Sequence, residues 1–117
     1  MSDDSQMLLP KKLIIALGGN AIHPAGIKGT GKEQFDIAAE AANALLPLLR
    51  DIPQLVITHG NGPGVGKVLL RQAIASKRVA SMPLVICVAN SQGGLSYVFM
   101  QTMLNSLSAA GVNREVS

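Results

Sequence analysis

The stretch Lys12-Leu-Ile-Ile-Ala-Leu-Gly-Gly-Asn20 decides the fold, because it joins a short apolar run directly to a glycine-rich corner. An apolar run with β-branched residues that ends at paired glycines is typical of a buried parallel strand, here residues 12–17. A second run of this kind, Gln54-Leu-Val-Ile-Thr58, is followed by the glycine-rich segment 60–66. The sequence therefore predicts two similar strand-to-loop corners.

The segment between the two runs predicts a loop and then a helix. Residues 20–32 contain several glycines and a proline and are expected to form a loop. Residues 33–50 place apolar side chains at helical spacing, and Pro47 is expected to kink or end this helix. Strand, loop, helix and strand in this order predict a right-handed βαβ unit with parallel strands, and hence the α/β class.

The second half of the chain is expected to be helical. A helix is predicted over about residues 65–76, and Ser81-Met-Pro83 resembles a helix start with proline in the first turn. We expect one long helix from there to about Ala110, with Gly93-Gly94 inside it. The apolar residues 84–88 leave a strand open as the alternative.

Composition limits the classes of protein that fit. The 117 residues suffice for one domain, which we expect at 11–117 after a polar tail at 1–10. With 48% hydrophobic and 15% charged residues, a folded core is expected. Three aromatic residues and a net charge of +3 without a basic stripe argue against nucleic-acid binding. Neither a signal peptide nor a membrane span is expected, which favours the cytoplasm, and the lone Cys87 is expected to be a buried structural thiol.

The two glycine-rich corners are the candidate site. Ligands of open α/β sheets bind beyond the carboxyl ends of the strands, and both corners follow such an end. Glycine lets backbone N–H groups approach an anion, and asparagine adds an amide that donates and accepts. The candidate residues for binding a substrate or phosphoryl group are Gly18, Gly19, Asn20, Gly60, Asn61 and Gly62.

Other polar residues support weaker hypotheses. The segment Lys28-Gly-Thr-Gly-Lys32 matches no known phosphate loop, so it is either a mobile surface loop or a segment that closes over an anionic substrate. His59 is either a structural hydrogen-bonding group or a base, whereas His23 is expected to be exposed to solvent. Neither histidine has a partner at metal-ligand spacing, so no metal held by protein side chains is expected.

Several motifs together resemble carbamate kinase, of the amino acid kinase superfamily. They run in order over about residues 12–112: Ile15-Ala-Leu-Gly-Gly-Asn-Ala21, Thr58-His-Gly-Asn-Gly-Pro63, Val65-Gly66, Met82-Pro-Leu84, Cys87, Ser91-Gln-Gly93 and Tyr97. The resemblance implies a three-layer αβα fold with a mainly parallel sheet, here incomplete, and a homodimer. It adds His59, Ser91 and Gln92 as secondary site candidates.

The implied reaction is reversible phosphoryl transfer between ATP and carbamate, in which carbamoyl phosphate and ADP give ATP and carbamate. Magnesium would accompany the nucleotide, and the usual setting is arginine catabolism. The glycine corners would bind the carbamate and the transferring phosphoryl group, where positioning and charge neutralisation do most of the work.

The chain also departs from the family pattern. Gly64 stands where glutamine is usual, Val85 stands where aspartate is common, and Gly94-Leu-Ser96 replaces an apolar residue, Ile and Gly. Members have about 300 residues, and their catalytic lysines and nucleotide pocket lie downstream, so no catalytic residue is assigned here. Three hypotheses follow: a fragment inactive alone, one half of a split kinase, or a non-catalytic anion-binding or regulatory module.

Overall fold

The structure is a computed structural model and describes residues 8–117. Two parallel strands, β1 (Lys12–Leu17) and β2 (Gln54–His59), pair in register from Lys12 opposite Gln54 to Leu17 opposite His59. Their carboxyl ends therefore lie at the same edge of the sheet. The predicted α/β class and the parallel pairing are confirmed.

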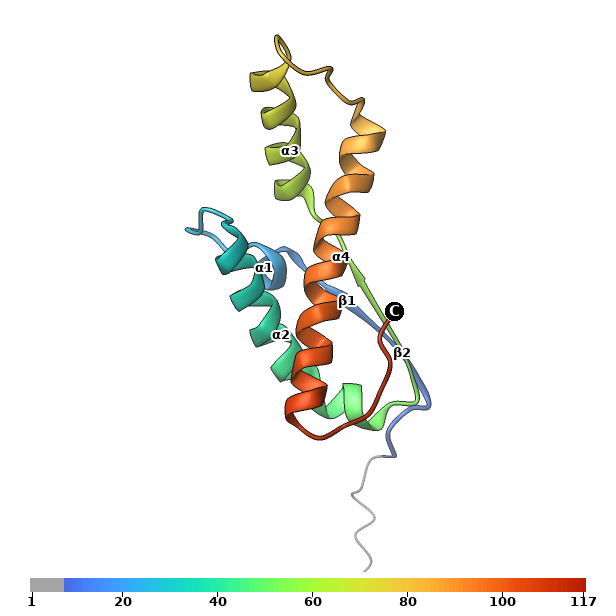
Figure 1. The fold of residues 1–117 in the computed structure, drawn as a ribbon. Helices are drawn as coiled ribbons and strands as arrows, with labels where there is room; N and C mark the ends of the chain where they lie inside the picture. Colours follow the sequence, from blue (N-terminus) through green and yellow to red (C-terminus); the bar gives the residue numbers. More distant parts are fainter. Residues whose placement is uncertain (1–7) are drawn as a thin grey trace, which may run out of the picture.

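Four helices complete the described chain, and Figure 1 shows their arrangement. They are α1 (Gly19–Ile22), α2 (Gly31–Asp51), α3 (Gly62–Ala75) and α4 (Leu84–Ala109). Helices α1 and α2 connect β1 to β2, while α3 and the first half of α4 form a hairpin that projects beyond the sheet. The long helix predicted around Gly93-Gly94 is confirmed, and the strand alternative at 84–88 is wrong.

Three local predictions need correction. Residues 19–22 form one helical turn rather than a loop, because Ile22 is buried and the turn closes through the His23 N–H and the Gly19 carbonyl at 2.7 Å. Helix α2 begins at Gly31 because Thr30 caps it. Of the two outcomes predicted at Pro47, an end of the helix is wrong, because α2 continues to Asp51, and a kink stays a prediction.

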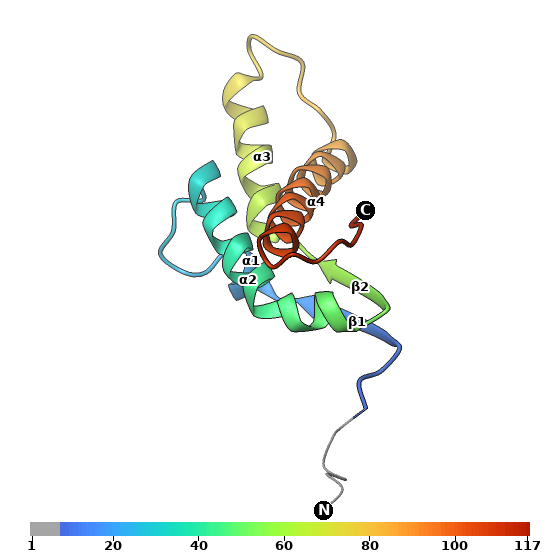
Figure 2. The same cartoon turned by 60° about the horizontal axis from the view of Figure 1, so that its bottom comes forward.

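The core lies between α2, α4 and one face of the sheet (Figure 2). Small residues of α2, including the buried Ala38 and Ala42, let α4 approach closely. The buried residues of this cluster are Ile22, Ala38, Ala42, Leu49, Leu95, Val98, Phe99, Met103 and Leu107, with Leu17, Leu55 and Ile57 packed against them from the sheet. The buried thiol of Cys87 agrees with its predicted structural role.

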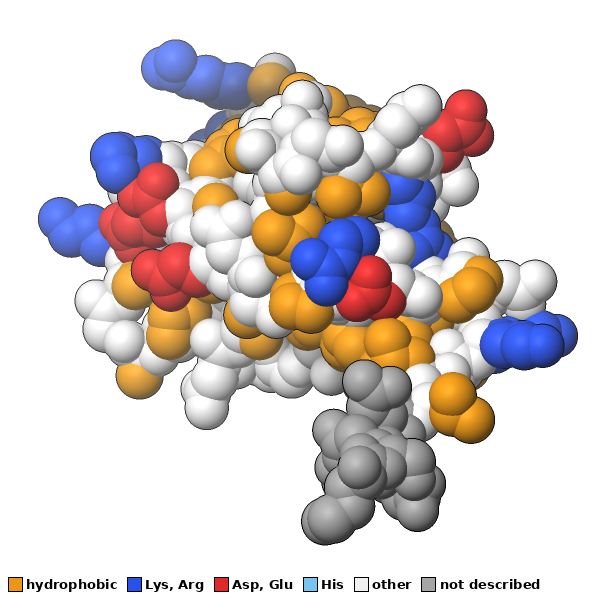
Figure 3. All heavy atoms as spheres, turned by 90° about the horizontal axis from the view of Figure 1, so that it is seen from below, with side chains coloured by type: hydrophobic (Ala, Val, Ile, Leu, Met, Phe, Trp, Pro, Cys, Tyr) orange, Lys and Arg blue, Asp and Glu red, His pale blue; other side chains and the backbone are white. Residues whose placement is uncertain are grey.

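The other face of the sheet is not covered by any described residue. Ile14 is 71% exposed and Val56 is 54% exposed, so the strands predicted as buried are covered on one face only within the described chain. The helical hairpin also exposes apolar side chains, namely Leu69, Leu70, Ile74, Val79, Met82, Leu84, Val85 and Ile86. Seen from below, hydrophobic side chains reach the surface between charged ones (Figure 3).

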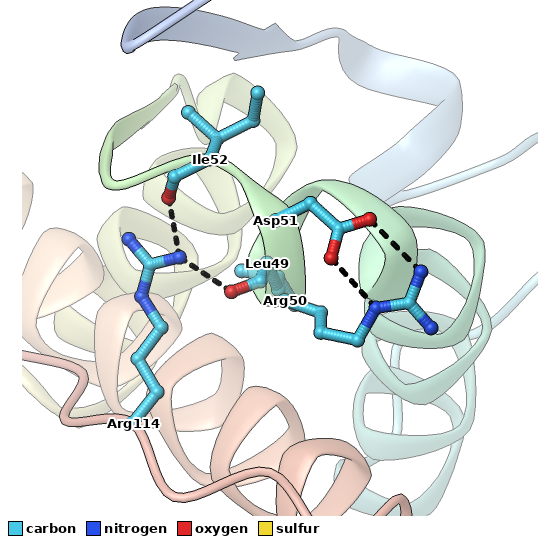
Figure 4. Close-up of polar contacts among 5 residues, drawn as sticks. All are labelled: Leu49, Arg50, Asp51, Ile52 and Arg114. Carbon is cyan, nitrogen blue, oxygen red and sulfur yellow. Dashed lines mark hydrogen bonds and ion pairs between the residues drawn. The ribbon is translucent and has the colours of Figure 1, made fainter. Parts of the chain in front are cut away.

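The C-terminal segment crosses back over the end of α2. Arg114 donates to the carbonyls of Leu49, Ile52 and Pro53, where α2 gives way to β2. Beside it, Arg50 and Asp51 form an ion pair with a nitrogen–oxygen distance of 2.8 Å (Figure 4). Arg114 therefore satisfies carbonyl groups at the end of α2 that have no partner within the helix.

Candidate anion-binding site

The two glycine corners meet at the carboxyl edge of the sheet. They enclose a cavity of about 210 Å³, which we call the glycine pocket. Its lining comes from β1, α1, the β2–α3 connection and the start of α3, and consists of Leu17, Gly19, Ile22, His23, Gly60, Asn61, Gly62 and Pro63. Drug-sized ligands occupy cavities of about 300–1,000 Å³, so this volume suits a small molecule or ion.

Three of the residues that line the pocket, Gly19, Gly60 and Gly62, are exposed glycines. A Cβ added at Gly19, Gly60 or Gly62 would meet no other atom of the described chain within 4 Å. Steric crowding within the protein therefore does not explain why these three residues are glycine. Their missing side chains leave the backbone of both corners open to a ligand, as an anion cradle requires.

Asn61 links the pocket to α4. Its side-chain Nδ2 donates to the Ser91 hydroxyl at 2.6 Å, although the two residues are 30 positions apart. Asn61 precedes α3 as its N-cap residue, but its side chain makes no capping hydrogen bond to that helix. The N–H groups of the first turn of α3 are therefore free of a side-chain cap beside the pocket.

Gly64 makes this orientation of Asn61 possible. A Cβ at Gly64 would contact the Asn61 amide group within about 2.5 Å, closer than real atoms approach. The glutamine usual in the family could not stand here without moving Asn61. The departure from the family pattern at Gly64 thus affects the position of Asn61, a residue that lines the pocket.

The structure does not bring all candidate residues into the pocket. Gly18 lies before α1, Asn20 is exposed on α1, and Gln92 is exposed on α4; none of them lines the cavity. His59 points instead toward α4, where its Nε2 lies 3.2 Å from the Ser96 hydroxyl and its ring lies 5.7 Å from that of Phe99. The His59 Nδ1 is buried and has no partner among the described residues. These contacts favour the structural hypothesis for His59.

His23 was expected to be exposed, and that prediction is wrong. It lines the glycine pocket, and its Nε2 lies 3.0 Å from the Nζ of Lys67 on α3. Lys67 was not a sequence candidate, because nothing in a spacing of 44 residues connects it to His23. In the segment 28–32, Lys67 Nζ donates to the Lys28 carbonyl, and the exposed Lys32 pairs with Asp36 within α2.

A larger cavity of about 460 Å³ lies between the sheet, α4 and the C-terminal segment. Its apolar walls come from Leu49, Leu55, Ile57, Phe99, Met100 and Met103, and the polar residues His59, Ser96, Glu115 and Ser117 line it as well. Arg114 also lines it, but this side chain donates to three backbone carbonyls. Because the Glu115 carboxylate also lines this cavity, while the Arg114 donors are taken by backbone carbonyls, its larger volume does not make it the better candidate for a small anion.

The donor set of the glycine pocket does not suit a metal ion. Magnesium prefers carboxylate and other hard oxygen ligands, and no carboxylate lines the pocket. Residues 8–117 contain no group of three or more His, Cys, Asp or Glu side chains placed to hold a metal. Within the same residues, no helix combines the length and the apolar character that crossing a membrane requires.

Comparison with known proteins finds carbamate kinases. The carbamate kinase of Pyrococcus horikoshii is 34% identical over 110 residues, covering 92% of this chain and 35% of that protein. The carbamate kinase-like protein YahI of Escherichia coli is 38% identical over 111 residues, covering 90% of this chain and 34% of that protein. The chain thus spans about a third of the length of the curated relatives it matches. No family model matches it.

The structural comparison agrees. Carbamate kinase from Giardia lamblia bound to AMP-PNP superimposes with a TM-score of 0.82 at 36% identity, covering 86% of this chain and 35% of that one. Similarity at this level in both sequence and structure shows homology. The described β1–β2 sheet and its helices therefore correspond to part of that α/β fold.

Proposed function

We propose that this chain, a homologue of the carbamate kinases over about a third of their length, is the amino-terminal part of such an enzyme and binds its phosphorylated substrate. The observation that carries the proposal is the glycine pocket, where Gly19, Gly60 and Gly62 come from two strand ends to one small cavity. The ligand we assign is carbamate or carbamoyl phosphate.

The pocket suits this ligand for three reasons. Its volume of about 210 Å³ is small, its glycines leave backbone N–H groups accessible, and the first turn of α3 adds the positive end of a helix dipole. Asn61 adds an amide that Ser91 holds in place. Donors fixed before the reaction stabilise charge on a transferring phosphoryl group without reorganisation.

The reaction we propose for the complete kinase is reversible transfer of a phosphoryl group between carbamoyl phosphate and ADP. The bound AMP-PNP in the Giardia relative supports nucleotide use by proteins of this type. Magnesium with ATP or ADP belongs to the same proposal. Because the glycine pocket does not fit the metal, no step is assigned to magnesium here.

The test is binding of carbamoyl phosphate measured by calorimetry, with ATP formation measured in parallel after adding ADP and magnesium. Gly19→Ala and Gly62→Ala add a methyl group to two residues that line the pocket without meeting other protein atoms, so both should weaken binding while preserving the fold. Gly66→Ala is the matched control, because Gly66 is also free of neighbours but does not line the pocket.

The outcomes separate the hypotheses that the sequence left open. Binding without ATP formation favours an anion-binding module or a part inactive alone, and turnover only with an added downstream polypeptide favours a split kinase. Equal affinity of the wild type, the two pocket variants and Gly66→Ala would contradict the proposed pocket.

Two further features of the family remain proposals. We propose self-association as a homodimer, for which the exposed apolar side chains of the α3–α4 hairpin and the uncovered sheet face are candidate surfaces. A cytoplasmic location and a role in arginine catabolism stay predictions from the sequence and its resemblance.

A further inference from the structure

Lys67 occupies an unusual position beside the glycine pocket. It lies on α3 and is half-buried, with its Nζ 3.0 Å from His23 Nε2 and in contact with the Lys28 carbonyl. Both partners belong to the connection between α1 and α2. One ammonium group therefore joins α3 to the segment that follows the first glycine corner.

The chemistry of this contact fixes the state of His23. A lysine ammonium group has three donors and no acceptor, so the imidazole Nε2 must accept its hydrogen bond. The ring is then neutral and carries its proton on Nδ1. The Nδ1–H is then the one donor left to the ring of His23, a residue that lines the pocket.

The close approach of Lys67 Nζ, His23 Nε2 and the Lys28 carbonyl depends on Gly29. Its φ of +78° lies in the region that favours glycine, and a Cβ there would contact Lys67 Nζ and lie 3.0 Å from His23 Nε2. The N–H of Gly29 donates to Glu33 Oε2 at 3.2 Å, which ties the same turn to α2. The turn that carries Lys28 and Gly29 is thus shaped around the Lys67–His23 contact.

The charges around the contact leave Lys67 as a source of positive potential. Glu33 is the nearby carboxylate, and its pKa is lowered mainly by the Gly29 N–H, with a smaller contribution from the charge of Lys67. No hydrogen bond or ion pair joins Lys67 to Glu33 or to another carboxylate among the described residues. A charge next to a pocket wall favours anions with more negative charge.

We propose that Lys67 is a positioning residue for anion binding in the glycine pocket: it holds His23 as the Nδ1–H tautomer and adds the positive charge that favours a dianionic phosphoryl group. This inference rests on the proposed function of the pocket. It assigns the selection of a phosphorylated ligand to the pair Lys67 and His23, which lie outside the glycine corners.

The first measurement is the tautomer of His23, read from long-range ¹⁵N–¹H NMR spectra at alkaline pH. The chain has only two histidines, so the spectrum is simple to assign. We expect the wild type to show His23 protonated on Nδ1, and Lys67→Met to move it toward the Nε2–H form. An Nε2–H tautomer in the wild type would overturn the proposal.

The second measurement is affinity for inorganic phosphate, followed by chemical-shift titration. Loss of the Lys67 charge, and of the His23 Nδ1–H donor that it holds in place, predicts about a tenfold or greater loss of affinity in Lys67→Met. Lys67→Arg should restore most of the binding, because it keeps the charge and the donors. Lys77→Met is the matched control, since Lys77 is exposed beyond the end of α3.

The two proposals fail in different ways. If the wild type binds phosphate and Lys67→Met binds it equally well, Lys67 has no such role and the pocket survives. If the wild type and Gly19→Ala bind equally or not at all, the pocket is wrong, and with it the role of Lys67 in anion binding. An unchanged His59 signal in each variant shows that the fold is preserved.

Discussion

The two faces of the β1–β2 sheet are made from alternate residues of the same strands, yet their surroundings differ completely. Leu17, Leu55 and Ile57 pack on the core formed by α2 and α4, whereas Ile14 and Val56 face outward. The outer face still carries apolar side chains at its centre, of the kind found in strands covered on both sides. The difference teaches that the sequence of a strand indicates the burial it is suited to, while neighbouring elements decide the burial it receives.

The difference between the two faces is tested most directly by removing one side chain from the covered side. Leu107 is 1% exposed at the α2–α4 contact, so Leu107→Ala should lower the free energy of unfolding by about 2–5 kcal/mol through lost burial and a cavity. Urea unfolding followed by circular dichroism measures this. The control Val56→Ala on the uncovered face should change it by about 0.5 kcal/mol or less. Equal losses would show that the outer face is covered in solution.

The uncovered face should instead govern self-association. Ile14→Thr combined with Val56→Thr keeps β-branched side chains but makes the face more polar, so the weight-average mass at high protein concentration should fall. Sedimentation velocity measures the change. Leu70→Gln with Ile74→Gln on α3 is the matched pair for the helical hairpin, where both residues are also exposed. If only the α3 pair lowers the mass, the hairpin and not the sheet face is the contact.

Much of this architecture could be predicted because it depends on local patterns. The strands at 12–17 and 54–59 follow from short apolar runs ending at glycines, and the long helix α4 was expected despite Gly93-Gly94. The starts of α2 and α3 were less well predicted. The Thr30-x-x-Glu33 capping box indicates the start of α2 at Gly31, and Pro63 in the first turn indicates the start of α3 at Gly62.

The site was predictable only in part, for a physical reason. Parallel strands bring their carboxyl ends together, so the meeting of Gly19 with Gly60 and Gly62 follows from topology. The contact between His23 and Lys67 depends on the path of the α1–α2 connection, which no periodicity encodes. The motifs predict Asn20 and Gln92 as site residues, but both lie on exposed helix positions outside the pocket.

Helix α2 packs on the covered face of the sheet, and the cap at its start should contribute a smaller share of the free energy of unfolding. The Thr30 hydroxyl accepts from the Glu33 N–H at 3.2 Å, so Thr30→Ala should cost about 1 kcal/mol of folding free energy. Urea unfolding measures the loss. Thr58→Ala removes the same atoms from an exposed position of β2 and is the control. A Thr30→Ala protein as stable as the wild type would mean that α2 needs no cap.

The smallest expected effect is the pH dependence of the same helix start. The pKa of Glu33 is lowered, chiefly because the Gly29 N–H donates to its carboxylate, so the folded state favours the charged form. The resulting stabilisation is fully present above the ordinary pKa of glutamate and is lost as the pH falls through the lower folded pKa. Glu33→Gln should therefore be less stable than the wild type at neutral pH, and the gap should close in acid. Thermal melting of the two proteins across this range measures the gap, and a gap that stays constant as the pH falls would show that it does not come from the charge of Glu33.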